Sequence, residues 1–234
     1  FREVQCLEKY PYIKYNPSPD EIITDMAFTL SPSTTNVSEA IISSDNKMKV
    51  GLTLKFIKDE FDKNYSTQIK NSIAYLIEKH DAHIYIFPHV QVNEDELGQG
   101  SDIKKAKDIY FSLSDKYKSK VTIFYDYYNP FELKELYSKM DIFIGTRLHS
   151  AIFAITENVP VINISYHGTK SKGVMGTLNL EEWVIDETNF DLLNNKIDQL
   201  IQNADKVKAN LTEAVRKSQN LIDNAIKLII SDSI

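Results

Sequence analysis

Short apolar runs alternate with longer amphipathic segments between about residue 47 and residue 185. Each run is rich in β-branched or aromatic residues and is bounded by polar ones, which is typical of a largely buried strand. The predicted strands are residues 49–54, 83–87, 120–125, 141–144, 160–164 and 182–185. Apolar residues recur at helical spacing in residues 66–80, 102–117, 130–140 and 149–157. This alternation predicts an α/β fold with a doubly wound parallel sheet and right-handed crossovers.

Individual residues indicate where some of these helices begin and end. Ser66 is a candidate N-cap for the first helix. Asn129 is a second candidate N-cap, because Pro130 follows it at the first helical position, where proline is favoured. Pro160 prevents the helix over 149–157 from continuing into the next strand.

The two ends of the chain differ from this central pattern. Residues 22–28 predict a short strand, and the polar residues 31–46 predict a linker. Residues 189–230 predict two amphipathic helices, which leave the apolar residues Ile226–Ile230 without an obvious partner. The chain begins at Phe1 without an initiator Met, so we expect it to be part of a longer protein.

Composition excludes several classes of protein. With 42% hydrophobic residues the chain is not disordered, and its single cysteine, Cys6, cannot form an internal disulfide. The net charge of −6 argues against a nucleic-acid partner. No apolar run reaches the roughly 18 residues of a membrane span, and no signal peptide is visible, so we expect a cytoplasmic protein.

Candidate chemistry gathers where the predicted strands end. The carboxyl ends of parallel strands share one edge of the sheet, and ligands bind beyond that edge. His89 follows one strand, Arg147 and His149 follow another, and residues 165–173 follow a third. This places a cationic rim on an otherwise acidic protein.

The segment Gly145–His149 is the most specific of these features. Gly145 permits a tight exit from the strand, and the next helix offers the free N–H groups of its N-terminus to an anion. Arg147, one of only three arginines, can bind a carboxylate or phosphate through two hydrogen bonds, and His149 can donate a proton. Alternatively, Arg147 caps the helix or pairs with a structural carboxylate, and His149 packs beneath the loop.

Other candidates carry weaker signals. The loop from Tyr166 to Gly173, with Lys170 and Lys172, suits a phosphate but is equally compatible with an ordinary turn. His89 alone is compatible with a structural role, as are His80 and His83 at the other edge, and the acidic residues 93–96 suit either a cation or solvent. No dinucleotide-binding, Walker, nucleophile-elbow or zinc motif is present.

Several segments together resemble the polysaccharide pyruvyl transferases. The sequence Gly-Thr-Arg-Leu-His at 145–149, Val-Pro-Val-Ile at 159–162, and Tyr166 with Lys170 and Gly173 follow the order of three motifs of that family. Upstream, Phe-Pro-His at 87–89, Gly-Ser-Asp at 100–102 and Asp-Met-Ala-Phe at 25–28 extend the resemblance. Residues 2–6 are similar to a further motif, with Cys6 in place of the usual serine.

The resemblance implies a GT-B-like architecture, with the active site in the cleft between two Rossmann-like domains. Residues 1–46 would be the end of the N-terminal domain and its linker, and residues 47–234 the C-terminal domain. The implied reaction transfers a pyruvyl group from phosphoenolpyruvate to a sugar of a cell-surface polysaccharide or exopolysaccharide precursor and forms a ketal. It needs no metal or cofactor, so we expect the activity to survive chelation by EDTA.

The resemblance also assigns roles to residues. Arg147 and His149 match the catalytic and donor-binding segment, and Arg2 matches a second arginine. We expect His149 to act as general acid and base and Arg147 to hold the donor. Candidate substrate-binding residues are Arg2, His89, Gly145, Thr146, Tyr166, Lys170 and Lys172.

Two other functions stay open at this stage. The chain could be a GT-B-type nucleotide-sugar glycosyltransferase or epimerase that uses the same helix N-terminus to bind a diphosphate. It could also be a non-catalytic sugar-binding domain. Binding of uridine or guanosine diphosphate would favour the first, and sugar binding without phosphate release would favour the second.

Overall fold

Six parallel strands form the centre of the molecule in the order β3-β2-β1-β4-β5-β6. The computed structural model describes residues 24–34, 37–38, 42, 46–57, 60–90, 101–166, 170–186 and 188–231. The strands are β1 (Lys49–Thr53), β2 (His83–Ile86), β3 (Val121–Ile123), β4 (Ile142–Gly145), β5 (Val161–Ile164) and β6 (Val184–Ile185). This is the strand order of a Rossmann-type doubly wound sheet, so the predicted fold class is confirmed. The order reverses between β1 and β4, where such sheets bind ligands.

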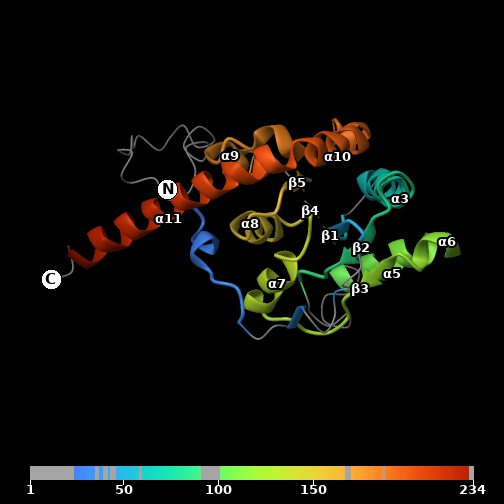
Figure 1. The fold of residues 1–234 in the computed structure, drawn as a ribbon, viewed down its shortest axis with the longest axis horizontal. Coiled ribbons are helices and arrows are strands. Elements are labelled where there is room, and N and C mark those ends of the chain that lie inside the picture. Colours follow the sequence, from blue (N-terminus) through green and yellow to red (C-terminus); the bar gives the residue numbers. More distant parts are fainter. Residues whose placement is uncertain are drawn as a thin grey trace.

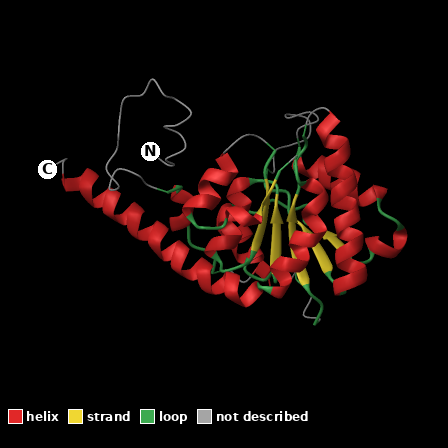
Figure 2. Cartoon of the chain, turned by 90° about the horizontal axis from the view of Figure 1, so that it is seen from above, coloured by secondary structure: helices red, strands yellow, loops and turns green. Residues whose placement is uncertain are grey.

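Helices cover both faces of the sheet (Figure 1). The helices are α3 (Glu60–His80), α5 (Asp102–Ser112), α6 (Asp115–Lys118), α7 (Pro130–Tyr137), α8 (Leu148–Thr156), α9 (Lys170–Thr177), α10 (Leu193–Gln202) and α11 (Ala204–Ser231). Figure 1 shows α3 and α5 on one side of the strands and α7 and α8 on the other. Helix α11 runs past α8, and its C-terminal half extends away from the body (Figure 2).

The predicted helix ends are correct in one case and wrong in another. Asn129 caps α7 as predicted, and a capping box with Glu132 completes the cap. Helix α3 begins at Glu60, so Ser66 is not its N-cap. Ser66 lies inside the helix, where its hydroxyl donates to the Asp62 carboxylate one turn earlier. A serine before a run of apolar residues at helical spacing can stand either at the N-cap or inside a longer helix, and the sequence pattern is the same in both cases.

Residues 24–34, called here the strap, do not form the predicted strand. The Asp25 side chain accepts a hydrogen bond from the N–H of Ala27 and caps a short 3₁₀ helix, η2 (Met26–Thr29). Phe28 is fully buried in the main core, and its carbonyl accepts a hydrogen bond from Gln219 of α11. The Asp25 cap therefore gives a 3₁₀ turn where the sequence predicted a strand, and Phe28 still reaches the core.

Two buried charged residues of α7 hold this part of the chain. The Lys134 ammonium donates to the Leu30 carbonyl and lies 3.0 Å from the Glu157 carboxylate of α8. Glu135 accepts hydrogen bonds of 3.0 Å from both the backbone N–H and the hydroxyl of Ser38. The strap is thus fixed to α7 and α11 by polar contacts as well as by burial of Phe28.

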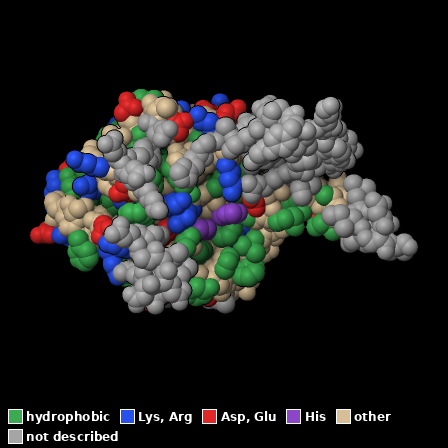
Figure 3. All heavy atoms as spheres, turned by 180° about the vertical axis from the view of Figure 1, so that it is seen from behind, with side chains coloured by type: hydrophobic (Ala, Val, Ile, Leu, Met, Phe, Trp, Pro, Cys, Tyr) green, Lys and Arg blue, Asp and Glu red, His purple; other side chains and the backbone are tan. Residues whose placement is uncertain are grey.

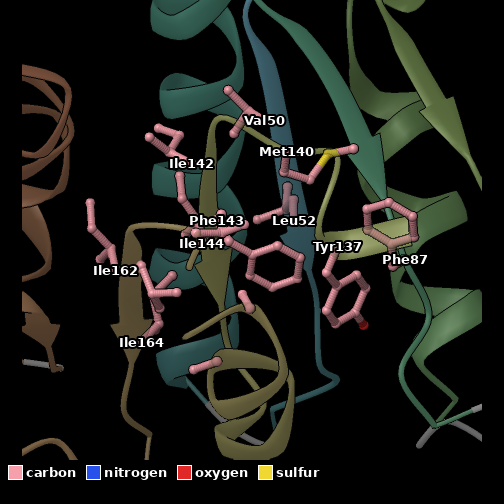
Figure 4. Close-up of a cluster of buried hydrophobic side chains, with 14 of the residues drawn as sticks. Val50, Leu52, Phe87, Tyr137, Met140, Ile142, Phe143, Ile144, Ile162 and Ile164 are labelled. Atoms are coloured by element: carbon pink, nitrogen blue, oxygen red, sulfur yellow. The ribbon is translucent and has the colours of Figure 1, made fainter. Parts of the chain in front are cut away.

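The core lies between the sheet and its helices (Figure 4). Val50, Leu52 and Ile144 lie together with apolar side chains of α3 on one face of the sheet. On the other face the Phe143 ring packs against Tyr137 of α7, with 4.4 Å between the ring centroids. A Cβ on Gly51 would lie 2.4 Å from Cδ2 of Phe143 and 2.9 Å from Cγ of Met140. Glycine in β1 therefore permits the close approach of the Phe143 ring.

The C-terminal part of the chain forms the two predicted helices, α10 and α11. Two further short 3₁₀ helices precede them, η4 (Glu181–Trp183) and η5 (Phe190–Leu192). Strand β6 is shorter than the predicted strand 182–185, because the first two residues of that prediction, 182 and 183, belong to η4. Ile226 is 40% exposed, while the side chains of 228–230 lie outside the described residues. None of the described helices has the length and apolar character needed to cross a bilayer.

Candidate functional site

A pocket of about 330 Å³ opens at the carboxyl edge of the sheet. The segments after β2, β4 and β5 line it with His89, Val90, Arg147, Leu148, His149, Ser165, Tyr166, Lys170 and Ser171. The structure thus brings together five predicted site residues that are far apart in sequence. Figure 3 shows histidine side chains beside lysine or arginine side chains on this face of the molecule.

Two helices begin at the pocket. Arg147 is the N-cap of α8, and among the residues that the structure describes no side chain caps this helix end. Helix α9 begins at Lys170, so the segment from Tyr166 to Gly173 is not wholly the predicted loop. Neither helix has an acidic residue in its first turn. Both N-termini therefore add positive potential and backbone N–H donors to the same pocket.

Arg147 is held by a buried carboxylate. Its Nη2 lies 2.5 Å from Oδ1 of Asp102, and its Nε lies 3.2 Å from Oδ2. Asp102 is fully buried at the start of α5, where the backbone N–H of Val90 also donates to it. The sequence left open a pairing of Arg147 with a structural carboxylate, and the structure shows this pairing. Arg147 also lines the pocket, so this pairing leaves its side chain within reach of a bound ligand.

Burial raises the pKa of Asp102 above its usual range, although the hydrogen bonds from Arg147 and from backbone N–H groups oppose that rise. The carboxylate and guanidinium together make a rigid, planar pair. One edge of the guanidinium is engaged by Asp102, which fixes the plane in which the remaining N–H groups point. This is an arrangement that preorganises Arg147 for a second planar anion.

His149 is accessible from the pocket. Its side chain is 49% exposed, and its Nε2 lies 3.5 Å from Oδ2 of Asp25 in the strap. The alternative in which His149 packs beneath the loop is therefore wrong. A half-exposed imidazole beside a carboxylate and at a pocket wall can exchange a proton with a bound molecule.

His89 is a neutral imidazole in this environment. Burial lowers its pKa to about 4, and the nearby charges of His149 and Arg147 act in the same direction. Its Nδ1 lies 3.3 Å from the hydroxyl of Tyr137, a buried phenol whose pKa is raised by desolvation. The ring also packs edge-on against Phe153. His89 can therefore offer the pocket an uncharged hydrogen-bonding group.

Gly145 and Thr146 lie behind the pocket and do not line it. A Cβ on Gly145 would come within 3.1 Å of the Ser150 hydroxyl. The Thr146 hydroxyl is 2.8 Å from that of Tyr65, and its N–H donates to the hydroxyl of Thr53. Both residues are buried parts of the turn that carries Arg147.

The remaining predicted residues lie at the rim or elsewhere. The Lys55 ammonium sits 3.7 Å from the centre of the Tyr166 ring, which joins the ends of β1 and β5 across the switch point. Lys170 is exposed at the pocket. Lys172 is paired with Asp186 at 2.6 Å, and this contact lowers the pKa of Asp186 to about 2. Lys172 is not one of the residues that line the pocket.

Several predicted features fall outside the described residues, namely Arg2, His167 and the acidic residues 93–96. His80 and His83 have the structural partners that their position predicted: the Asp198 carboxylate and the Thr122 hydroxyl, each at 2.8 Å. Within the described part of the chain, no group of three or more His, Cys, Asp or Glu side chains could hold a metal ion.

Sequence reasoning did not assign the two carboxylates of the site, Asp25 and Asp102. Asp102 lies at a predicted helix start directly after Ser101, which gives an ordinary helix-capping pattern. Asp25 was placed in a predicted strand. Their partners, His149 and Arg147, lie 124 and 45 residues away along the chain, and no local spacing shows such pairs.

Comparisons with known proteins agree with this picture. The family model described as "Polysaccharide pyruvyl transferase" matches residues 9–168. The amylovoran biosynthesis protein AmsJ of Erwinia amylovora is 30% identical over 127 residues, which make up 53% of this chain and 29% of AmsJ. The match therefore spans less than a third of that relative.

Solved structures match by fold. Sucrose-phosphate synthase from Thermosynechococcus elongatus has a TM-score of 0.55 at 15% identity, over 88% of this chain and 50% of that one. WaaG, a glycosyltransferase involved in lipopolysaccharide biosynthesis, has a TM-score of 0.52 at 14% identity, over 97% of this chain and 60% of its own. At these identities the likeness shows the fold alone, and it confirms the predicted Rossmann-like α/β unit of GT-B type over the part that matches.

Proposed function

Because the chain belongs to the polysaccharide pyruvyl transferase family, we propose that it carries the phosphoenolpyruvate site of an enzyme that transfers a pyruvyl group to a saccharide. The observation that supports this most is the convergence of Arg147, Lys170 and two helix N-termini on one pocket. The acceptor would be a sugar of a cell-surface polysaccharide or exopolysaccharide precursor, as the AmsJ likeness suggests.

The donor fits the charges of the pocket. Phosphoenolpyruvate carries a carboxylate and a phosphate on three carbons, so its binding calls for cations and N–H donors more than for apolar walls. Arg147 would hold one anionic group through its free edge, and Lys170 with the start of α9 would neutralise the other. The neutral ring of His89 would add a hydrogen bond without adding charge.

The chemistry requires one proton donor and a site for the leaving phosphate. A proton adds to the methylene carbon of phosphoenolpyruvate while one saccharide hydroxyl oxygen bonds to the central carbon. The bond from that carbon to the phosphate oxygen breaks, and a second hydroxyl oxygen takes its place to close the ketal. Two hydroxyl protons are lost, one replacing the proton spent on carbon and one leaving with phosphate. His149 would shuttle these protons, and no step calls for a metal or cofactor.

The fold also suits an alternative, a nucleotide-sugar transferase. One neighbour of this fold is a trehalose-6-phosphate protein from E. coli bound with UDP-2-fluoro glucose, at 12% identity and a TM-score of 0.51, over 80% of this chain and 44% of that one.

Calorimetric titration of phosphoenolpyruvate tests the proposal. We expect the wild type to bind it more tightly than inorganic phosphate, and Arg147→Ala to abolish binding. Arg216→Ala is the matched control, because Arg216 is an exposed arginine on α11 paired with Glu213, outside the pocket. Uridine and guanosine diphosphates are titrated in parallel.

Each outcome separates the two functions. Binding of phosphoenolpyruvate that depends on Arg147 and not on Arg216 supports the pyruvyl transferase. Tight binding of a nucleoside diphosphate, with none of phosphoenolpyruvate, overturns it in favour of the nucleotide-sugar transferase.

A further inference from the structure

The strap contributes a carboxylate to the pocket from outside the sheet. The two oxygens of Asp25 have different partners: Oδ1 accepts the Ala27 N–H at 3.1 Å, and Oδ2 lies 3.5 Å from Nε2 of His149. The side chain of Asp25 is 10% exposed, so this contact is largely shielded from solvent. One carboxylate therefore joins the backbone of η2 to the imidazole of α8.

This position of Asp25 is built by the tertiary structure. One residue earlier, the Thr24 hydroxyl donates to the Ser218 carbonyl of α11, and three residues later Phe28 is fully buried. The Gln219 side chain and the buried Lys134 ammonium bind the carbonyls of Phe28 and Leu30. Contacts on both sides thus fix the strap, and the carboxylate has little freedom to leave His149.

We propose that Asp25 is a positioning residue that orients His149 and fixes which of its ring nitrogens carries the proton. With its Oδ2 at 3.5 Å from Nε2, the carboxylate is an acceptor that faces this nitrogen and favours the tautomer in which Nε2 carries the proton. Nδ1 is then the nitrogen that accepts and donates protons at the substrate. The catalytic part of this inference rests on the proposed function, whereas the pairing itself does not.

The replacement Asp25→Asn tests this with little disturbance of the fold. The Asn oxygen can keep the cap on Ala27, because asparagine is as good an N-cap as aspartate. Its NH₂ group would then face Nε2 as a donor and force that nitrogen to accept, so the proton would move to Nδ1. A single substitution thus reverses the tautomer and removes the free electron pair that Nδ1 needs.

Long-range ¹H–¹⁵N NMR of the imidazoles reads the tautomer directly, with His149→Gln used to assign the signals. At a pH where the ring is neutral, we expect Nε2–H in the wild type and Nδ1–H in Asp25→Asn. Asp223→Asn, which changes an exposed carboxylate on α11, is the control and keeps Nε2–H. Phosphate release from phosphoenolpyruvate with a panel of hexose methyl glycosides is measured on the same proteins.

For that turnover we expect Asp25→Asn to lower kcat about 10- to 100-fold and to leave KM for phosphoenolpyruvate nearly unchanged. The same tautomer in wild type and Asp25→Asn overturns the pairing, and a reversed tautomer with unchanged kcat overturns its role in catalysis. A wild type that releases no phosphate with any glycoside counts against the proposed function, and the NMR result still decides the pairing.

Discussion

Arg147 and Asp102 form a two-point contact that joins the turn after β4 to the first turn of α5. The carboxylate is fully buried and the guanidinium is 19% exposed, so the pair has one side in the core and one in the pocket. The contact gives Arg147 two separable roles. It compensates a buried charge, and in the proposed function it presents a fixed guanidinium edge to the donor.

Substitutions at this pair separate stability from binding. Arg147→Ala leaves the buried carboxylate without its counter-charge, and we expect the free energy of unfolding to fall by about 3 kcal/mol. Adding Asp102→Asn to that variant removes the uncompensated charge and should restore part of the loss. Phosphoenolpyruvate binding should be absent from both. Urea unfolding and calorimetry measure the two effects, and equal stabilities for the single and double variants would contradict the charge argument.

If the proposed function holds, His149→Ala should abolish turnover and largely retain donor binding, because the proposal assigns most of the charge that holds phosphoenolpyruvate to Arg147 and Lys170, which line the pocket. The control is His80→Ala, which removes an imidazole at the opposite edge of the sheet, paired with Asp198. Phosphate release measures turnover and calorimetry measures binding. A fully active His149→Ala variant would remove the imidazole from the mechanism.

Two lysines two residues apart make a matched pair. Lys170 lines the pocket, whereas Lys172 is tied to Asp186 and does not. We expect Lys170→Ala to weaken phosphoenolpyruvate binding about tenfold, the effect of roughly 1.4 kcal/mol. Lys172→Ala should leave the affinity within twofold of the wild type. The reverse order in a calorimetric comparison would place the phosphate nearer Lys172.

The low pKa of His89 predicts a loss of stability in acid. Its pKa is about 4 in the folded protein, whereas the ordinary value of 6.5 applies to the unfolded chain. Between pH 4 and pH 6.5 the unfolded chain therefore binds more protons than the folded protein. The stability that neutral His89 confers is complete above pH 6.5 and is lost as the pH falls toward 4. When the pH is lowered from 7 to 4.5, His89 should reduce the free energy of unfolding by about 2 kcal/mol.

His89→Asn isolates that contribution, because asparagine can still accept a hydrogen bond from Tyr137 but does not titrate. Urea unfolding of both proteins at pH 7 and pH 4.5 cancels the effect of all other groups. The wild type should lose about 2 kcal/mol more than the variant over this range. Equal losses would mean that His89 titrates normally in the folded state.

Replacement of glycine by alanine is expected to have opposite effects on stability at two positions. Gly51→Ala places a methyl group against the Phe143 ring and Met140, and we expect it to destabilise the fold by about 2 kcal/mol. Gly176→Ala lies in α9, where no atom of the described residues is within 4 Å of the new Cβ, and it should stabilise the fold by about 0.5 kcal/mol. Thermal unfolding measures both. A neutral Gly51→Ala would show that the Phe143 ring moves aside freely.

Local patterns predicted the parts of the structure that depend on local forces. The six strands were visible because each is a short apolar run between polar residues, and the Asn129 cap because its hydrogen bonds lie within three residues. The grouping of His89, Arg147 and His149 also followed from sequence, since parallel strands must end at one edge.

Where local preference and tertiary contact disagreed, the sequence was not sufficient. Residues 22–28 have the apolar character of a strand, yet the Asp25 cap and the burial of Phe28 against α8 and α11 turn the backbone into η2. Likewise, Ser66 has the chemistry of an N-cap but lies within α3, because the helix starts earlier, at Glu60.

The amino-acid sequence by itself determined the α/β fold, the edge that carries the candidate site and the cations at that edge, because periodicity and strand direction are local properties. Only the tertiary structure decided that Asp102 holds Arg147 and that Asp25 faces His149. These carboxylates come from segments whose distance in the chain carries no information about their distance in space. Packing of the strap against α8 and α11, and burial of the first turn of α5, bring them there.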